Sequence, residues 1–269
     1  MLSVDSAIHR VRRDITLGVM VKGVLLGAVL ACLMFAHPSI RFLALTGVIG
    51  VWIALSMTSA RTSRLAIDSP SLIAAGQFDE AEQHIDQAMR GFSLFSAVKL
   101  QSLHQLAMLR HAQRRWQESA ALSSALLGQR LGATRGLSKA SRMILAESLL
   151  EMNELGGAYG AIYGLYGEQL SLNEVLVLLA VQLDYESKIG AWHKMFSSAA
   201  AKVQLAELMP SHQAARVQAL LALAALKVGR PDWARWLADR AQLLADVDKL
   251  TGERPILGEL WNKPSEAQV

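Results

Sequence analysis

Ala74-Ala75-Gly76-Gln77-Phe78-Asp79-Glu80-Ala81-Glu82-Gln83-His84-Ile85-Asp86-Gln87-Ala88-Met89 has the pattern of a helix end, a tight turn and a second helix. Gly76 stands at the turn, and the small Ala81 stands where two antiparallel helices must approach closely. Phe78 and Ile85 are large enough to fill the space between the two helices. The stretch therefore predicts a helical hairpin.

The pattern recurs at a nearly constant spacing along the chain. Turn markers comparable with Gly76, at successive separations of 38, 39, 37 and 39 residues, stand at Arg114, Asn153, Gly190 and Gly229. A small residue stands seven positions before three of these markers, at Ala107, Ala146 and Ala222. The sequence therefore predicts an all-α protein with about five helix pairs over residues 65–250.

Two of the helix pairs depart from the pattern. In the fourth pair, Leu183 takes the small position of the first helix and Met195 stands where the second helix should have alanine. In the first pair, Ser69 and Pro70 predict a helix start, with serine as N-cap and proline at the first helical position. That start leaves little room for a full first helix before Gly76.

These helix pairs resemble the tetratricopeptide repeat (TPR), whose pattern runs glycine, aromatic residue, glutamate, alanine, and then a bulky residue and alanine on one helix face. The period exceeds the ~34 residues of the standard repeat, which implies longer helices or loops. The resemblance implies a right-handed α-solenoid whose first helices line a groove for a peptide or a partner's helix. The candidate groove is lined by Gln101, His104, Met108, His111, Met143, Glu147, Asp184 and Arg216.

Two apolar runs precede the helix pairs, in a chain that is 52% hydrophobic. They cover residues 15–36 and 40–60, and at ~1.5 Å per residue each is long enough to cross the core of a bilayer. The sequence therefore predicts a transmembrane hairpin over residues 15–60, preceded by a cytoplasmic segment over residues 1–14. We expect the hairpin to be separate from the core of the repeat domain. The tail, residues 251–269, is predicted to be a short cap followed by disorder.

Small residues recur at helical spacing in both apolar runs and allow close contact between backbones. They are Gly23, Gly27 and Ala31 in the first run and Gly47, Gly50 and Ala54 in the second. Two interpretations are open. These residues pack the hairpin against itself, which is the favoured interpretation, or they dock it against another membrane protein.

The net charge of +4 is unevenly distributed. Residues 1–64 hold seven basic and two acidic residues, whereas the remaining 205 residues carry a net charge of −1. This distribution favours a positive-inside topology with both termini and the repeat domain in the cytoplasm, and it argues against nucleic acid as a partner. The single cysteine, Cys32, excludes an intrachain disulfide.

Charge is also segregated within the repeat domain. Residues 143–190 hold seven acidic residues and one lysine. The preceding stretch, residues 110–142, holds Glu118 and a candidate basic patch made of Arg110, Arg114, Arg115, Arg130, Arg135, Lys139 and Arg142. Two interpretations are open: solvated faces that partly neutralise one another, or a surface for anionic headgroups or an acidic partner.

No pattern of residues in the sequence predicts a catalytic, nucleotide-binding or metal site. The sequence has no P-loop, no Gly-x-Gly-x-x-Gly, no Gly-x-Ser-x-Gly and no His-Glu-x-x-His. His104 and His111 are seven residues apart, which is too far for both to bind one metal ion. We therefore expect no enzyme activity, no cofactor and no metal.

The sequence as a whole predicts a TPR-like adaptor or scaffold, anchored in the inner membrane of a bacterium, which binds other proteins at the cytoplasmic face. The alternative is a structural accessory subunit of a larger membrane complex, in which the hairpin is also an interface. HemY-type proteins have a similar general layout, with two N-terminal spans followed by TPR units.

Overall fold

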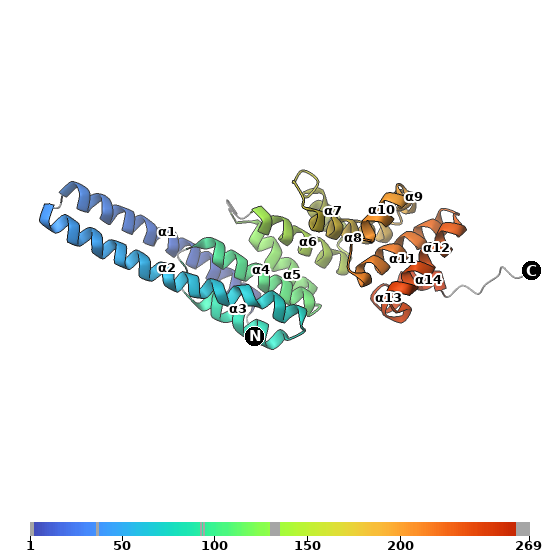
Figure 1. Ribbon diagram of the computed structural model, residues 1–269, viewed down its shortest axis with the longest axis horizontal. Helices are drawn as coiled ribbons and strands as arrows, with labels where there is room; N and C mark the ends of the chain where they lie inside the picture. Colours follow the sequence, from blue (N-terminus) through green and yellow to red (C-terminus); the bar gives the residue numbers. More distant parts are fainter. Residues whose placement is uncertain (1–2, 36–37, 92, 94, 130–134, 262–269) are drawn as a thin grey trace, which may run out of the picture. The chain divides into compact units, whose positions relative to one another are not determined.

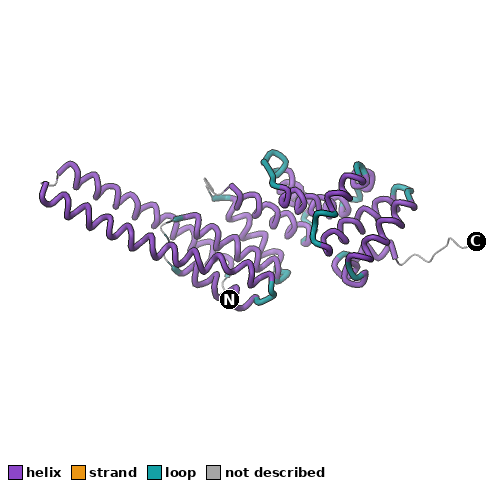
Figure 2. The backbone as a smooth tube through the Cα atoms, viewed as in Figure 1, coloured by secondary structure: helices purple, strands orange, loops and turns teal. Residues whose placement is uncertain are grey.

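The computed structural model describes residues 3–35, 38–91, 93, 95–129 and 135–261, and this part of the chain is helical with no strand (Figure 2). The all-α prediction is therefore confirmed. The chain divides into two compact units, residues 1–148 and 149–269, here called the N-terminal unit and the C-terminal unit.

The N-terminal unit begins with two long helices, α1 (Val4–Phe35) and α2 (Pro38–Ala74), which run antiparallel and lie side by side (Figure 1). They are followed by α3 (Phe78–Arg90), α4 (Ser96–Ala112), α5 (Trp116–Leu127) and α6 (Arg135–Glu151). Among the described residues, one helix, Val4–Met34, is long and apolar enough to cross a membrane, by length and composition. The apolar part of α2, Leu45–Ala60, is shorter.

The start of α1 belongs to the core of the N-terminal unit. Ala7 and Val11 are buried against α3, α4 and α5, in a cluster that includes Ile85 and Leu103. Apolar residues at this spacing lie on one helix face, which explains why a polar and basic stretch contributes to a core. Residues 1–14 were predicted as a segment preceding the hairpin, and the expected separation of hairpin and repeat core is wrong.

A buried ion pair joins α1 to α4. Lys99 has its Nζ 2.9 Å from the carboxylate of Asp14, and it also donates a hydrogen bond to the carbonyl oxygen of Met89 at 2.7 Å. Both charged side chains are largely shielded from solvent. Because each charge has partners, burial is tolerated here.

Helix α2 continues through Pro70, so the helix start predicted at Ser69 and Pro70 is wrong. Proline inside a helix removes one hydrogen bond and crowds the preceding turn, which is why sequence rules favour a start there. In the structure, the C-terminal part of α2 packs on α3 and α4 and serves as the first helix of the first pair. Packing on two neighbours outweighs the local preference of proline.

The small residues of the two apolar runs do not pack α1 against α2. Gly23, Gly27, Ala31, Gly47, Gly50 and Ala54 are all exposed. A Cβ atom added at any of the four glycines would meet no atom within 4 Å. Larger side chains of both helices, including Leu25, Val29 and Val48, are half-buried and line a hollow shared by α1 and α2. The favoured interpretation of the small residues is therefore wrong, because bulkier side chains set the separation of the helices.

The C-terminal unit is arranged around α11 (Ser211–Lys227), most of whose residues are buried. Its other helices are α7 (Leu155–Tyr163), α8 (Leu172–Lys188), α9 (Trp192–Phe196), α10 (Ala199–Ala206), α12 (Pro231–Leu244), α13 (Val247–Glu253), η1 (Pro255–Leu257) and α14 (Gly258–Trp261). Part of the predicted tail is thus folded, since Leu257 is buried in the same core. The end of the tail, residues 262–269, lies outside the described residues.

All five predicted turn markers adopt a left-handed backbone conformation. Their φ angles are 76° at Gly76, 59° at Arg114, 61° at Asn153, 68° at Gly190 and 76° at Gly229. Each marker donates its N–H to the carbonyl three residues back, and the next residue donates to the carbonyl five residues before itself. This is the Schellman arrangement, which closes a helix and reverses the chain. The predicted turn positions are confirmed.

The first helices of the later pairs are equal in length. Helices α4, α6, α8 and α11 each contain 17 residues. The second helix of the fourth pair is interrupted, because α9 and α10 are separated at Ser198, which has φ of 56°. Leu183 and Met195, the bulky residues of this pair, are both fully buried. Their volume keeps the two helices from approaching as closely as alanine would allow.

The left-handed turns give a stability prediction. Arginine in this conformation has an unfavourable contact between Cβ and the carbonyl oxygen, so Arg114→Gly should raise the free energy of unfolding by about 1 kcal/mol. Gly76→Ala should lower it by about 1 kcal/mol through backbone strain alone, because the added Cβ meets no atom within 4 Å. Gly136→Ala, within α6, is the control and should be neutral or stabilising. Denaturation of the full chain in mild detergent measures these differences, and equal stability of Arg114→Gly and the parent would contradict the prediction.

Candidate functional site

A hollow of about 470 Å³ lies on the open side of α4 in the N-terminal unit. It is lined by Pro70, Ala97, Gln101, His104, Gln105, Met108, Gly136 and Leu137, which come from α2, α4 and α6. Three of the predicted groove residues, Gln101, His104 and Met108, are thus brought together because they lie on one face of α4. We call this hollow the α4 groove.

His104 is buried at the floor of the α4 groove, with its Nδ1 2.8 Å from the hydroxyl oxygen of Ser141 in α6. Burial lowers the pKa of His104 to about 4. The imidazole is therefore neutral at pH 7, and one of the two partners donates the hydrogen bond while the other accepts it. The contact ties α4 to α6 across the groove.

His111 and Glu147, two further predicted groove residues, contact each other. His111 Nε2 lies 3.3 Å from a carboxylate oxygen of Glu147, and its ring meets Trp116 edge to face at a centroid distance of 4.9 Å. Met143 is buried in α6 and is not an open groove residue. Its side chain fills the core because the register of α6 turns this position inward.

Asp184 and Arg216 lie in the C-terminal unit, where they form an ion pair with each other. Arg254 also reaches Asp184, at 3.2 Å, and Glu151, at 2.5 Å. Asp184 is only 2% exposed, so its prediction as an open groove residue is wrong. Two guanidinium groups neutralise the carboxylate and hold it inside the fold.

Arg110, a member of the candidate basic patch, is fully buried. Its guanidinium lies between Glu82, at 3.0 Å, and Glu118, at 3.3 Å. Arg110 is therefore a core residue and not part of a surface patch. Glu82 lies in α3, outside residues 110–142, over which the charge of the patch was counted.

The other members of the basic patch differ in exposure and in their ion-pair partners. Arg115 pairs with Glu118, and Arg114 is exposed at its turn. Lys139 and Arg142 are half-buried on α6. The side chains of Arg130 and Arg135 lie outside the described residues. Residues 110–142 carry a net charge of +6 in the sequence. The positive charge at the surface is lower, because glutamates pair with two of these arginines.

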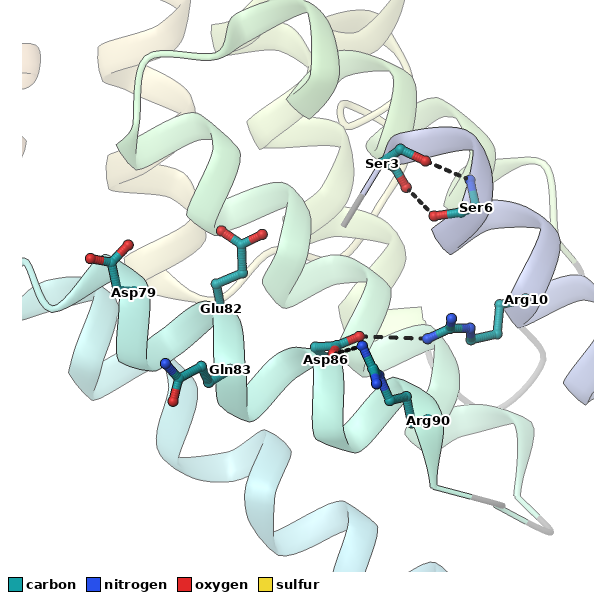
Figure 3. A pocket seen from close by; sticks show the side chains of 8 residues that line it. All are labelled: Ser3, Ser6, Arg10, Asp79, Glu82, Gln83, Asp86 and Arg90. Atoms are coloured by element: carbon teal, nitrogen blue, oxygen red, sulfur yellow. Dashed lines mark hydrogen bonds and ion pairs between the residues drawn. The ribbon is translucent and has the colours of Figure 1, made fainter. Parts of the chain in front are cut away.

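A polar hollow of about 610 Å³ separates the start of α1 from α3 (Figure 3). It is lined by Ser3, Ser6, Arg10, Asp79, Glu82, Gln83, Asp86 and Arg90. Figure 3 shows Arg10 and Arg90 reaching Asp86 from two different helices. Sequence reasoning missed this site because it treated residues 1–14 as separate from α3. Asp86 and Arg90 are four residues apart on one helix, and this spacing, which is typical of an ion pair, could have indicated part of the site.

All four tyrosines of the chain gather in the C-terminal unit, which the sequence did not indicate. Ring centroids are 5.9 Å apart for Tyr159 and Tyr163, 5.8 Å for Tyr159 and Tyr185, and 6.3 Å for Tyr163 and Tyr166. Burial raises the pKa of Tyr166. Tyr159, Tyr163 and Tyr166 remain exposed, so the cluster presents aromatic surface on α7 and the turn that follows it.

Within the part of the chain that the structure describes, no group of three His, Cys, Asp or Glu side chains could hold a metal ion. No family model matches the chain, and comparison with curated proteins and with solved structures gives no match either. The argument for function therefore rests on the repeated turns and on the α4 groove.

The buried histidine gives a pH prediction. The unfolded chain takes up the His104 proton near pH 6.5, whereas the folded chain takes it up only near pH 4. The unfolded state binds more protons between these values, so stability should fall as the pH falls through this window, by about 2 kcal/mol at pH 5. Denaturation at pH 7 and pH 5 measures the loss. His104→Gln should remove most of it, and His193→Gln, at an exposed position, should not. Equal losses in parent and His104→Gln would contradict the prediction.

Proposed function

We propose that this chain is a membrane-anchored adaptor whose helix pairs form a TPR-like α-solenoid. The observation that carries the proposal is the repetition of one helix ending at Gly76, Arg114, Asn153, Gly190 and Gly229, with the same two hydrogen bonds each time. Four of these five turns follow first helices of 17 residues. One turn repeated after helices of equal length is expected of a repeat protein, in which similar faces stack.

The α4 groove is the proposed binding surface for a partner protein. Gln101 offers an amide that donates and accepts, and Met108 offers a flexible apolar surface that adapts to different side chains. Neutral His104 adds a polar group without a buried charge. This combination suits an amphipathic helix or an extended peptide, the ligands that TPR-like grooves take. We propose that the chain acts by binding and has no catalytic role.

The anchor in this proposal is a two-span hairpin made by α1 and α2. Three arginines precede the first apolar run, and Arg61 and Arg64 follow the second. The positive-inside rule then places both termini and the helix pairs in the cytoplasm, at the inner membrane of a bacterium. The packing of Ala7 and Val11 in the core supports placing the N-terminus on the same side as the helix pairs.

Cysteine labelling tests this topology. In a Cys32→Ser background, Ser39→Cys at the start of α2 should react with a membrane-impermeant maleimide in intact cells. Ser124→Cys, which is exposed on α5, should react only after the cells are opened. Labelling of position 124 and protection of position 39 in intact cells would reverse the proposed orientation.

A second candidate function is that of an accessory subunit in a larger membrane complex. The exposed small residues of α1 and α2 favour it, because they leave an outward surface on which another transmembrane helix could approach closely. In this case the hairpin is an interface as well as an anchor.

Site-specific photocrosslinking separates the two functions. A photoreactive residue at Gln101, in the α4 groove, should give a defined protein adduct if the chain is an adaptor. The same residue at Gln117, exposed on α5, is the control and should not. An accessory subunit should instead crosslink from Ala54 and retain stoichiometric membrane partners in mild detergent. Adducts of equal yield from Gln101 and Gln117 would contradict a binding role for the groove.

A further inference from the structure

Three arginines meet where α1 changes from polar to apolar. Arg10 and Arg13 come from α1, and Arg90 is the last residue of α3. Together with Asp14 and Leu17 they line a hollow of about 360 Å³ in the N-terminal unit. That volume is within the range of small-ligand sites, about 300–1,000 Å³. We call this hollow the arginine pocket.

The arginine pocket has more positive than negative charge. Asp86 lies 2.7 Å from Arg90 and 3.5 Å from Arg10. Asp14 lies 3.5 Å from Arg13 and 2.9 Å from the buried ammonium of Lys99. Two carboxylates therefore face four cations, which leaves an excess positive charge beside the pocket.

Part of the guanidinium donor capacity remains open to a ligand. The side chains of Arg13 and Arg90 are 64% and 70% exposed. The Nη1 atom of Arg10 lies 3.5 Å from Asp86, so Arg10 is engaged by that carboxylate and the open donors belong to Arg13 and Arg90. Figure 3 shows Arg10 and Arg90 converging on Asp86 from α1 and α3. Guanidinium groups bind phosphate through paired hydrogen bonds, and the exposed Arg13 and Arg90, which line the pocket from α1 and α3, suit a compact anion.

Leu17 adds an apolar wall to the pocket. It is 44% exposed and belongs to the apolar run that begins at Ile15. An anion with only polar groups gains nothing from this wall, whereas a headgroup attached to a glycerol and acyl chains places its apolar part there. Along α1 the pocket therefore places phosphate-binding arginines before an apolar surface. Headgroups and acyl chains follow one another in the same order at the edge of a bilayer.

We propose that the arginine pocket binds the phosphate of an anionic phospholipid headgroup, with Arg13 and Arg90 as the principal ligands and Leu17 beside the glycerol. The inference rests on the proposed membrane anchor, because it requires α1 to enter the bilayer after residue 15. A headgroup held at this point fixes the depth of α1 and attaches α3 to the membrane surface. Basic pockets next to membrane-spanning helices recognise anionic lipids in this way.

Binding to the full-length protein in mild detergent tests the proposal. The probes are short-chain phosphatidylglycerol, short-chain phosphatidylcholine and inorganic phosphate, each measured by calorimetry. We expect phosphatidylglycerol to bind most tightly. Loss of charged hydrogen bonds in Arg13→Gln/Arg90→Gln should weaken this binding about tenfold or more. Arg12→Gln is the matched control, because Arg12 lies in the same basic run, is exposed and does not line the pocket.

The possible results are distinguishable. Unchanged phosphatidylglycerol affinity in the double variant, with Arg12→Gln as reference, overturns the site. Equal affinity for inorganic phosphate overturns the lipid assignment. Partial recovery in Arg13→Lys/Arg90→Lys supports charge recognition, and the melting temperature of each variant shows that the fold is intact. Release of the parent protein from membranes by alkaline carbonate would overturn the proposed anchor, whatever the affinities measured in detergent.

Discussion

The left-handed residue at the end of each first helix is the constraint on which the rest of the structure depends. At this residue the chain leaves the helix, satisfies two terminal carbonyls and reverses direction within a few residues. Four of the first helices have the same length, so the chain reverses at regular intervals. The α4 groove follows from this geometry, since Gln101, His104 and Met108 project from one face of a helix so placed.

The contact between Asp14 and Lys99 joins the proposed anchor to the helix pairs. A buried lysine loses much of its hydration, and burial lowers the pKa of Lys99. Its charge is nevertheless held by the Asp14 carboxylate and by backbone carbonyls at the end of α3. With Ala7 and Val11 in the same core, the start of α1 packs together with the first helix pairs. A partner in the α4 groove would therefore be held at a fixed place relative to α1.

Charge has different roles in different parts of the N-terminal unit. Arg110 is buried between two glutamates, so it stabilises the packing of α3, α4 and α5 and offers little to a ligand. Arg13 and Arg90 are exposed although each contacts a carboxylate: Arg13 lies 3.5 Å from Asp14, which is closer to Lys99, and Arg90 lies 2.7 Å from Asp86. The distinction depends on which acids face each arginine across helices. This difference separates Arg110, which stabilises the fold, from the arginines of the proposed lipid site, whereas the sequence shows only basic residues.

The sequence by itself determined the helical class, the turn positions and the deviation of the fourth helix pair, because turn residues and helix periodicity act within a few positions of the chain. It also brought Gln101, His104 and Met108 onto one face. Only the tertiary structure decided that α2 continues through Pro70, that Ala7 enters the core, and that Arg110, Met143 and Asp184 are buried. These outcomes depend on contacts between residues distant in sequence, whose energies outweigh local preferences and do not appear in any single stretch of the chain.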